Sequence, residues 1–535
     1  MRLLFALTIT LLLSGCYKNE SAITDSLIYC SANYPQSFNP QISHDISTLD
    51  ATTHQLYNRL VKIDPINDGF IPDLATHWQQ SDDKLSFTFF LRKDVTFQQT
   101  DYFTPTRNFN ADDLIFSFQR MINKEQPFHA TNRITDNYFF NHSFTNLVAD
   151  IVKIDDYKVK FILNKPDVTL LAHLAAHYGV ILSKEYAQNL LASGTPEKID
   201  FYPIGTGPYK FKNADKRTGI IRYLSHATYW QGSPTIKNLI FDVTGNNTKR
   251  HSKLLSGECD VITSPAPSQL NTILANPRLI TSTKTTKNIA LWSFNSLQKP
   301  FDQKEIRRAL SYAIDQKRII NAIFPQSAIV TNGLLAKRSW AYNPISDELQ
   351  YSPELAKNML EKNNFNFSRI ISILIPSEND FFNPNFKKTA ELIKANLFAI
   401  GVKSKIIPLS HSKLKRRLAS AHYDTYLTGV NVHVDDPDSL FRPLLSCDSS
   451  ILQGNSSQWC SKKVQHLLDS SLLESNFAKR VINYHKLQEI IQQERPYYPI
   501  AHLLRIDVFN QNISGLLVNP LTGIDFQNVR KIEAH

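Results

Sequence analysis

Several motifs that mark large enzyme and metal-binding classes are missing from this chain of 535 residues. It contains no G-x-S-x-G elbow, no Walker phosphate loop, no H-E-x-x-H pair and no C-x-x-C pair. These absences argue against a serine hydrolase, a P-loop NTPase, a zinc peptidase and a cysteine-bound metal site. We therefore expect a protein that is not an enzyme and that holds no metal.

Long apolar runs, internal repeats and low-complexity tracts are also missing. Beyond the first 13 residues, no apolar stretch approaches the roughly 18 residues that a transmembrane helix needs. Hydrophobic residues make up 42% of the chain and charged residues 20%, which is typical of a globular protein. Because one hydrophobic core seldom grows past about 250 to 300 residues, we expect two or three domains.

The amino terminus has the pattern of a secretory signal. Met1 and Arg2 precede an apolar and threonine run over 3–13, which is too short to span a bilayer as a mature helix. The ending LSGC resembles a bacterial lipobox, so we predict a signal peptide over 1–15 and lipidation of Cys16. A signal peptide without a lipid is the alternative. In either case we expect a mature chain that is soluble and lies outside the cytoplasm, at most tethered to a membrane.

Four further cysteines fit an oxidising compartment: Cys30, Cys259, Cys447 and Cys460. Four cysteines allow three pairings. Cys447 and Cys460 are thirteen residues apart in a segment with serine, asparagine and glycine, so we expect them to close a small loop, which leaves Cys30 with Cys259. The second bridge would place the strand around Cys30 in one sheet with the region around residue 259. A metal site formed by the four cysteines is the alternative.

Strand and helix patterns alternate along the chain. Apolar and alternating runs predict strands at 27–30, 86–92, 157–163, 220–224, 239–243, 259–262, 291–295, 370–375 and 402–407. Helical spacing predicts helices from about residue 47 and at 114–121, 169–177, 304–313, 354–362, 387–400 and 464–471. Two such blocks, divided near residue 288, predict an α/β protein with two lobes and a third subdomain in the amino-terminal half.

The segment YPIGTGPYKF at 202–211 separates these regularly patterned regions near the middle of the chain. Gly205 and Gly207 can take a positive φ and allow close approach of other groups, while Pro203 and Pro208 fix the direction of the chain. We therefore predict a crossing between domains here, with Gly205 and Gly207 as hinge residues. An ordinary surface turn is the alternative.

Three motifs resemble a known family. They are LRKDVTF (91–97) followed by FNADDLIFSF (109–118), PIGTGPY (203–209) and IRRALSYAID (306–315). Together they are similar to the extracytoplasmic solute-binding proteins of oligopeptide, dipeptide and nickel ABC transporters, known as solute-binding protein family 5. The segments 252–261, 339–343 and 438–447 resemble most the branch that serves Sap-type peptide transporters, with dipeptide-binding proteins next.

The resemblance implies a two-lobed periplasmic binding protein of type II (cluster C) with an extra third subdomain. It implies a domain I formed by 16–57, 206–287 and 505–535, a domain II at 58–205 and a domain III, the second lobe, at 288–504. Such a protein is a periplasmic monomer that captures peptides, antimicrobial peptides among them, between its lobes. It delivers them to a membrane permease and requires no cofactor. The cysteine pairing expected above matches the pattern of dipeptide-binding relatives.

Two charged positions of the family's dipeptide site differ in this sequence. Dipeptide-binding relatives hold the ligand's amino group with the first aspartate of a D-x-x-D-P-D loop, and His433 occupies that position before Asp436. In those relatives an arginine before an N-P-N turn pairs with the ligand carboxylate, and Asp380 stands there in this chain. A buried unpaired ammonium or carboxylate costs several kcal/mol. We therefore expect a longer peptide, bound mainly through its backbone as in strand addition.

Further ligand contacts are expected from the resemblance. An imidazole in a cleft can ligate haem iron, and some dipeptide-binding relatives carry haem, so haem captured by His433 is an alternative ligand. The alternatives to ligand contact are a backbone-bonded loop histidine, turn-forming carboxylates and core aromatics. The predicted ligand-binding residues are His433, Asp435, Asp436, Asp438, Trp340, Trp292, Phe294, Tyr423 and Asp380.

The charge balance favours a different class of partner. The formal net charge is +11, and basic runs at 249–253 and 413–417 would favour anionic partners such as haem propionates, phospholipid headgroups or nucleic acid. A solvated charged face without a partner is the alternative for each run. The acidic residues Asp435, Asp436 and Asp438 would make a negative cleft inside this basic shell.

Overall fold

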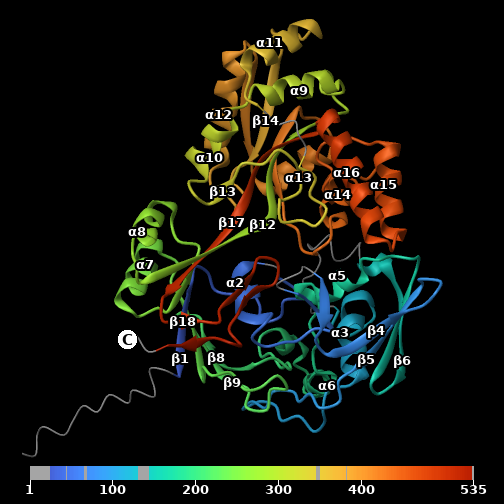
Figure 1. The fold of residues 1–535 in the computed structure, drawn as a ribbon, viewed down its shortest axis with the longest axis vertical. Coiled ribbons are helices and arrows are strands. Elements are labelled where there is room, and N and C mark those ends of the chain that lie inside the picture. Colours follow the sequence, from blue (N-terminus) through green and yellow to red (C-terminus); the bar gives the residue numbers. More distant parts are fainter. Residues whose placement is uncertain are drawn as a thin grey trace, which may run out of the picture.

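The protein consists of two lobes joined by two long strands (Figure 1). A computed structural model describes residues 25–43, 45–64, 69–129, 144–344, 350–380 and 382–532. The predicted signal peptide and Cys16 lie outside these residues. Within the described part of the chain, no helix is both long and apolar enough to cross a membrane. Both ends of the described chain lie in the first lobe, at the bottom of Figure 1.

One large sheet runs through both lobes, in the order β15-β14-β16-β12-β17-β11-β1-β10-β9-β8, and β13 pairs with β17 beside this path. Its second-lobe strands are β13 (Ala328–Ile329), β14 (Ile370–Pro376), β15 (Lys403–Leu409) and β16 (Thr425–Val430). Its first-lobe strands are β1 (Ser26–Ser31), β8 (Tyr209–Asp215), β9 (Ile220–Ser225), β10 (Asn238–Val243) and β11 (Val261–Thr263). The predicted α/β class and most predicted strands are confirmed.

Two strands connect the lobes. β12 (Leu279–Phe294) and β17 (Tyr497–Asn510) pair antiparallel from Leu279 opposite Asn510 to Ser293 opposite Tyr497. At one end β17 pairs with β11 of the first lobe, and at the other β12 pairs with β16 of the second lobe. This two-stranded ribbon is visible in Figure 1 as the green and red strands between the lobes. The sequence predicted only the last residues of β12 and did not predict β17.

The rest of the first lobe contains a second sheet and several helices. The sheet has the order β4-β5-β7-β6, with β4 (Ala75–Gln80), β5 (Ser86–Leu91), β6 (Val148–Asp155) and β7 (Lys158–Leu163). Its helices are α2 (Ile46–Thr52), α3 (Ala111–Ile122), α5 (Leu170–Ala175), α6 (Lys184–Ala192), α7 (Asn247–Ser256) and α8 (Leu270–Leu274). Short pairs are formed by β2 (Val61–Ile63) with β3 (Phe70–Pro72), β18 (Ile513–Ser514) with β21 (Arg530–Lys531), and β19 (Leu517–Asn519) with β20 (Gly523–Asp525).

The second lobe surrounds its part of the sheet with helices. They are α9 (Lys304–Tyr312), α10 (Gln316–Ile323), α11 (Pro353–Lys362), α12 (Phe386–Ala399), α13 (His411–Ala419), α14 (Asp438–Leu445), α15 (Lys462–Leu473) and α16 (Phe477–Glu494). Local sequence explains many helix starts. Asn110 and Asp113 form a reciprocal capping box that starts α3, as the sequence NADD indicates. The predicted domain boundaries stay predictions, because one hydrophobic cluster joins residues of domains I and II.

The predicted crossing at Gly205 and Gly207 lies inside the first lobe. Neither glycine has a positive φ among the described residues, so that expectation is wrong. The close approach is confirmed, because a Cβ on Gly207 would lie 2.5 Å from the Leu56 carbonyl carbon, and Gly205 also contacts Leu56 too closely for a side chain. The lobes themselves are connected through β12 and β17. The hinge role predicted for these glycines stays a prediction.

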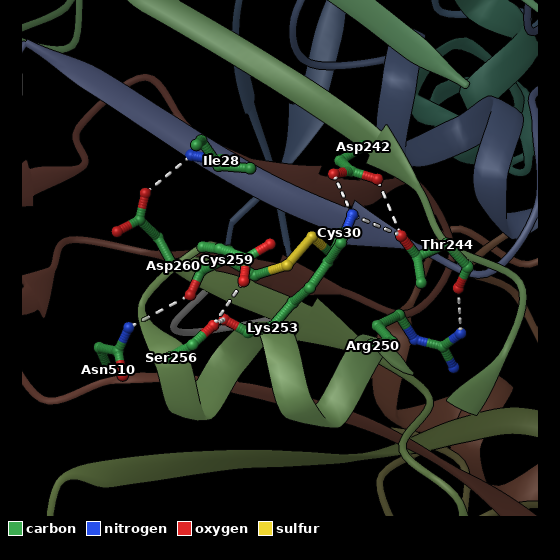
Figure 2. Close-up of a disulfide and its surroundings, with 11 residues drawn as sticks. Ile28, Cys30, Asp242, Thr244, Arg250, Lys253, Ser256, Cys259, Asp260 and Asn510 are labelled. Atoms are coloured by element: carbon green, nitrogen blue, oxygen red, sulfur yellow. Dashed lines mark hydrogen bonds and ion pairs between the residues drawn. A yellow bond between two sulfur atoms is a disulfide. The ribbon is translucent and has the colours of Figure 1, made fainter. Parts of the chain in front are cut away.

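Both predicted disulfides are present, and Figure 2 shows the one between Cys30 and Cys259. This bridge joins β1 to the turn between α7 and β11, and β1 pairs with β11 as expected. Two cations of the basic run at 249–253 form hydrogen bonds or ion pairs near this bridge. The buried Arg250 donates to the Thr244 carbonyl at 2.7 Å, and Lys253 pairs with Asp242 at 2.5 Å. This run is therefore largely structural, whereas the basic residues of α13 are exposed.

A buried ionic cluster fastens β17 to the first lobe. The Arg505 guanidinium donates to both carboxylate oxygens of Asp50 at 2.9 and 3.0 Å, and to those of Asp507 at 2.8 and 3.1 Å. Asp50 also accepts hydrogen bonds from the Tyr29 hydroxyl and the Ile524 amide. Burial raises the pKa of Asp50 even though Arg505 lowers it. One cation thus compensates two carboxylates away from water.

We expect Arg505→Met to lower the free energy of unfolding at pH 7.5 by about 3 to 5 kcal/mol, because it leaves buried carboxylates without their cation. Losing Arg505 raises the pKa of the Asp50 carboxyl group further, so the loss of stability becomes smaller as the pH falls and this group takes up a proton. Thermal denaturation at pH 7.5 and pH 5 measures both effects. The control Arg217→Met removes an exposed arginine and should change stability by less than about 0.5 kcal/mol. An equal loss at both pH values would contradict the expectation.

Candidate functional site

β16 has one incompletely paired edge. It pairs with β12 from Phe294 opposite Thr425 to Ile289 opposite Val430. With β14 it pairs only at Thr425 and Tyr426, so in the described structure the edge beyond Tyr426 has no strand partner on that side. An extended peptide can add to such an edge through backbone hydrogen bonds. The sequence analysis did not predict β16 as a strand.

Phe382 borders this open edge. It lies in the loop between β14 and α12, and its ring occupies the space where a side chain on Gly429 would stand. Any residue larger than glycine at position 429 would therefore collide with the ring. Asp380 lies in the same loop, where it is exposed and accepts hydrogen bonds from the backbone amides of Phe382 and Asn383 at 2.8 and 2.9 Å. Its carboxylate caps its own turn, so the ligand contact predicted for it stays a prediction.

The loop after β16 carries His433 to the junction of the two lobes. His433 is half-buried, and its ring faces His177 of the first lobe, with centroids 5.6 Å apart. Val434 packs into the hydrophobic cluster of the first lobe. The amide of Val168 also donates across the junction to the Leu472 carbonyl at 3.1 Å. The lobes are therefore in contact along this side of the cleft.

The three acidic residues of the loop are compensated by nearby cations. Asp435 is buried and pairs with Lys287 of the ribbon. Asp436, also buried, accepts two hydrogen bonds from Arg480 at 2.9 and 3.1 Å. Each of these two carboxylates already has a protein cation, so the ligand contact predicted for Asp435 and Asp436 stays a prediction.

Asp438 is paired in the same way at the first turn of α14. It accepts from Arg442 at 2.8 and 3.0 Å, and Arg442 also donates to Asp469 at 2.9 Å. The position of Asp438 near the helix amino terminus is itself favourable for a carboxylate. Like Asp436, it reaches the cavity described below, so it contributes charge to the cleft without being unpaired.

Three of the four predicted aromatic contacts lie in the core of the second lobe. Trp292 and Phe294 are fully buried, with ring centroids 4.6 Å apart. Tyr423 is buried and donates its hydroxyl hydrogen bond to the Ser456 carbonyl at 2.6 Å. Ligand contact predicted for these three is wrong, and the core alternative holds. Trp292 and Phe294 are buried because residues 289–294, at the second-lobe end of β12, are covered on both faces of the strand.

Trp340 packs on α16 and contacts Arg480, the cation that pairs with Asp436. Its ring lies 4.8 Å from that of Phe477, and the Arg480 guanidinium stands 5.0 Å from its centroid. A cation over an indole is held by the ring's negative face. Trp340 therefore orients the arginine that pairs with Asp436, and the ligand contact predicted for it stays a prediction.

A cavity of about 290 Å³ lies beside the His433 junction, between α5 and α14. Its first-lobe wall includes Asp167, Thr169 and His173, and its second-lobe wall includes Asp438 and Arg442. In Figure 1 these two helices face each other across the right side of the junction. The sequence analysis missed Asp167 and His173, because the pattern PDVT reads only as the start of a helix. Their neighbours on α14 are about 270 residues away in the chain.

The cavity perturbs the titration of both first-lobe groups. Burial raises the pKa of Asp167 to about 6, with smaller upward contributions from the carboxylates of Asp438 and Asp436, while hydrogen bonds from Thr169 oppose the shift. Burial lowers the pKa of His173 to about 4. At neutral pH the cavity thus holds an ionised Asp167, whose charged form is disfavoured by burial, and an uncharged His173. Within the described residues, no group of three or more His, Cys, Asp or Glu is arranged to hold a metal ion.

We expect Asp167→Asn to stabilise the ligand-free protein at pH 7.5 by about 1 to 2 kcal/mol, because it removes a buried charge whose ionised form is disfavoured. A raised carboxyl pKa means that ionisation costs stability above about pH 6. This cost in stability decreases as the pH falls towards about 4, the ordinary pKa of an aspartate. The gain should therefore shrink from pH 7.5 to pH 4 in thermal denaturation. A variant that is less stable than the wild type at both pH values would show that the charge is stabilising.

Comparisons with known proteins agree on one family. Residues 69–451 match the model of the bacterial extracellular solute-binding proteins, family 5. The chain is 35% identical over 511 residues to the peptide transport periplasmic protein SapA of Salmonella typhimurium, which covers 95% of this chain and 92% of that one. It is 33% identical over 527 residues to heme-binding protein A of Haemophilus influenzae, covering 96% and 95%.

The structure is likewise similar to a solved complex. It matches a dipeptide-binding protein from Pseudoalteromonas sp. SM9913 bound to Met-Leu, with a TM-score of 0.79 and 35% identity over 95% of this chain and all of that one. The two-lobed α/β fold, the sequence motifs and the family match thus coincide over nearly the whole chain. The chain belongs to the bacterial extracellular solute-binding proteins of family 5, the substrate-binding components of transporters.

Proposed function

We propose that the protein is the periplasmic substrate-binding component of a peptide ABC importer, which captures peptides between its lobes and delivers them to a membrane permease. The observation that carries this proposal is the open edge of β16 beside the lobe junction. The relatives named for peptide transport and for dipeptide binding support it. A monomer tethered through a lipid on Cys16 is part of the same proposal.

The charges at the cleft indicate how the peptide is held. The acidic loop residues are paired with protein cations, and Asp380 caps its own turn. Neither the amino nor the carboxyl terminus of a peptide therefore meets an uncompensated partner at the positions that the dipeptide site would use. Backbone hydrogen bonds along β16 do not depend on the termini. Longer peptides that extend past the cleft fit this arrangement better than free dipeptides.

Native mass spectrometry of the mature protein, purified without refolding, tests the proposal directly. We expect a series of co-purifying peptide masses that are released on denaturation. A protein that carries no peptide, and that also binds none from a mixed peptide library, would contradict peptide capture.

Blocking both termini of a ligand should matter little if the backbone supplies most of the contacts. We expect a pentapeptide with an acetylated amino end and an amidated carboxyl end to bind within about threefold of its free form, because both forms make the same backbone contacts. On the free-energy scale, 1.4 kcal/mol corresponds to tenfold in affinity, so a threefold change is about half of that. Isothermal titration calorimetry with the two forms of one sequence measures the ratio. A loss of more than about tenfold on blocking would show that a terminus is bound by an ion pair.

Haem is the second candidate ligand. The facing rings of His433 and His177, and the relative named for heme binding, favour it. The acidic wall of the neighbouring cavity, with Asp167 and Asp438, disfavours the propionate groups of haem. A released haem mass in the same experiment would support this candidate. His433→Ala, compared with a change of the exposed His411 to alanine, would then test the axial ligand through the Soret band.

A further inference from the structure

The basic run at 413–417 is part of a larger cationic surface on the second lobe. Residues 401–423 contain six lysines and arginines and no aspartate or glutamate. All six of these basic residues are exposed. Together they are called the basic face here: Lys403, Lys405, Lys413, Lys415, Arg416 and Arg417.

The fold places both parts of the basic face on one side of the sheet. β15, which carries Lys403 and Lys405, is the outermost strand of the large sheet and pairs with β14. Ile407 of β15 packs against the hydrophobic cluster that contains Leu414 and Leu418 of α13. Because successive side chains of a strand point to opposite faces, Lys403 and Lys405 lie on the same side as Ile407. The lysines of the strand and the cations of α13 therefore belong to one surface.

Within the described ranges of the chain, none of the six cations of the basic face forms an ion pair. The first acidic residue that follows them in the chain, Asp424, already accepts hydrogen bonds from the Arg369 guanidinium at 2.5 Å and from the Ser372 hydroxyl at 2.8 Å. The run at 249–253 differs, because Arg250 and Lys253 bond to neighbouring groups. Lysines on an edge strand also discourage pairing between molecules, but that role does not account for four further cations on a helix.

Exposed apolar side chains lie beside these cations. Ile370 of β14 is 53% exposed and stands opposite Lys403 in the strand register. It is on the α13 side of the sheet, because Leu374, four residues further along the same strand, belongs to the α13 cluster. Phe398, which is 74% exposed, lies near the end of α12, shortly before β15 begins. Cations combined with protruding apolar groups are typical of surfaces that bind an anionic membrane interface.

The apolar residues distinguish a lipid surface from a nucleic acid as the partner. The headgroup layer of a membrane accepts cations at its phosphates and apolar side chains at the boundary with the acyl chains. A nucleic acid backbone offers phosphates but no apolar complement to Ile370. A lipid surface therefore matches both the charge and the apolar residues of this part of the second lobe.

We propose that the basic face docks the second lobe on a membrane surface that contains anionic phospholipids, with Ile370 inserted among the headgroups. The inference goes beyond peptide capture and does not depend on it. In Figure 1 the elements that carry the face belong to the upper lobe, whereas the described chain begins in the lower one. A lipid on Cys16 and the basic face would thus hold the two lobes separately, which restricts rotation of the tethered protein at the membrane.

Vesicle binding by a chain without the lipid tests the proposal. The mature chain carries Cys16→Ser, so any binding comes from the folded protein and not from an anchor. In a sedimentation assay at low salt, we expect phosphatidylcholine vesicles with about 30% phosphatidylglycerol to bind it about tenfold or more tightly than pure phosphatidylcholine vesicles. Because salt screens exposed charges, we expect affinity for the anionic vesicles to fall about fivefold or more between about 50 and 300 mM salt.

Two charge-matched variants assign the binding to the basic face. The first removes the α13 cations through Lys413→Gln, Lys415→Gln, Arg416→Gln and Arg417→Gln, and the second removes four exposed cations of the first lobe through Lys198→Gln, Lys216→Gln, Arg217→Gln and Arg222→Gln. We expect the first to lose about tenfold or more in affinity for anionic vesicles and the second less than about threefold. Ile370→Ser should weaken binding without changing its salt dependence. Because all these residues are exposed, thermal denaturation should show little change in stability.

Three results would overturn membrane docking. They are failure to bind anionic vesicles, equal binding to neutral and anionic vesicles, and an equal loss of affinity in the two charge-matched variants. Binding of duplex DNA by a protein that fails to bind vesicles would assign the face to nucleic acid and overturn the proposal as well. Peptide capture is measured separately, by calorimetry without vesicles, so its failure and the failure of membrane docking are distinguishable.

Discussion

Arg505 holds together the part of the protein on which the cleft depends. The chain leaves the first lobe through β12 and returns through β17, and these two strands pair with each other along most of their length. Arg505 anchors β17 between Asp50 and Asp507 in the first lobe. Fixing β17 fixes β12, and β12 in turn pairs with β16. The position of the open edge and of the loop that follows it thus rests on one buried guanidinium at the far end of the ribbon.

The acidic residues of the loop that follows β16 are paired with cations of the protein itself, without a ligand. Lys287, Arg480 and Arg442 each pair with one of its three aspartates, and Trp340 holds Arg480 in place. Ion pairs buried in this way add little net stability but impose a defined conformation when their geometry is good. The loop therefore presents a fixed backbone and His433 to the first lobe, while the uncompensated charge of the junction comes from Asp167 on the opposite side.

The sequence predicted well where local chemistry decides the outcome. The α3 capping box, the strand around Cys30 and both disulfides depend on residue type and spacing, and the structure contains them. β17 was missed because it is buried on both faces and contains Pro499, so it lacks the period-two pattern of an ordinary strand. Trp292 and Phe294 were misassigned for the same reason, since hydrophobicity cannot distinguish a cleft wall from a core. Asp167 and His173 gain their role only from contact with α14, and that meeting is a property of the tertiary fold.

Contact between the lobes affects a buried charge in the cavity between α5 and α14. Burial of Asp167 in this cavity is the main cause of its raised pKa, and the carboxylates of Asp438 and Asp436 add to it, so the contact between the lobes carries an electrostatic cost at neutral pH. A ligand shifts a conformational equilibrium only by its difference in affinity for the two states. A ligand that binds better when the lobes are in contact must therefore offset the cost of keeping Asp167 ionised in this cavity, so the charge of one buried carboxylate enters the free energy of ligand binding.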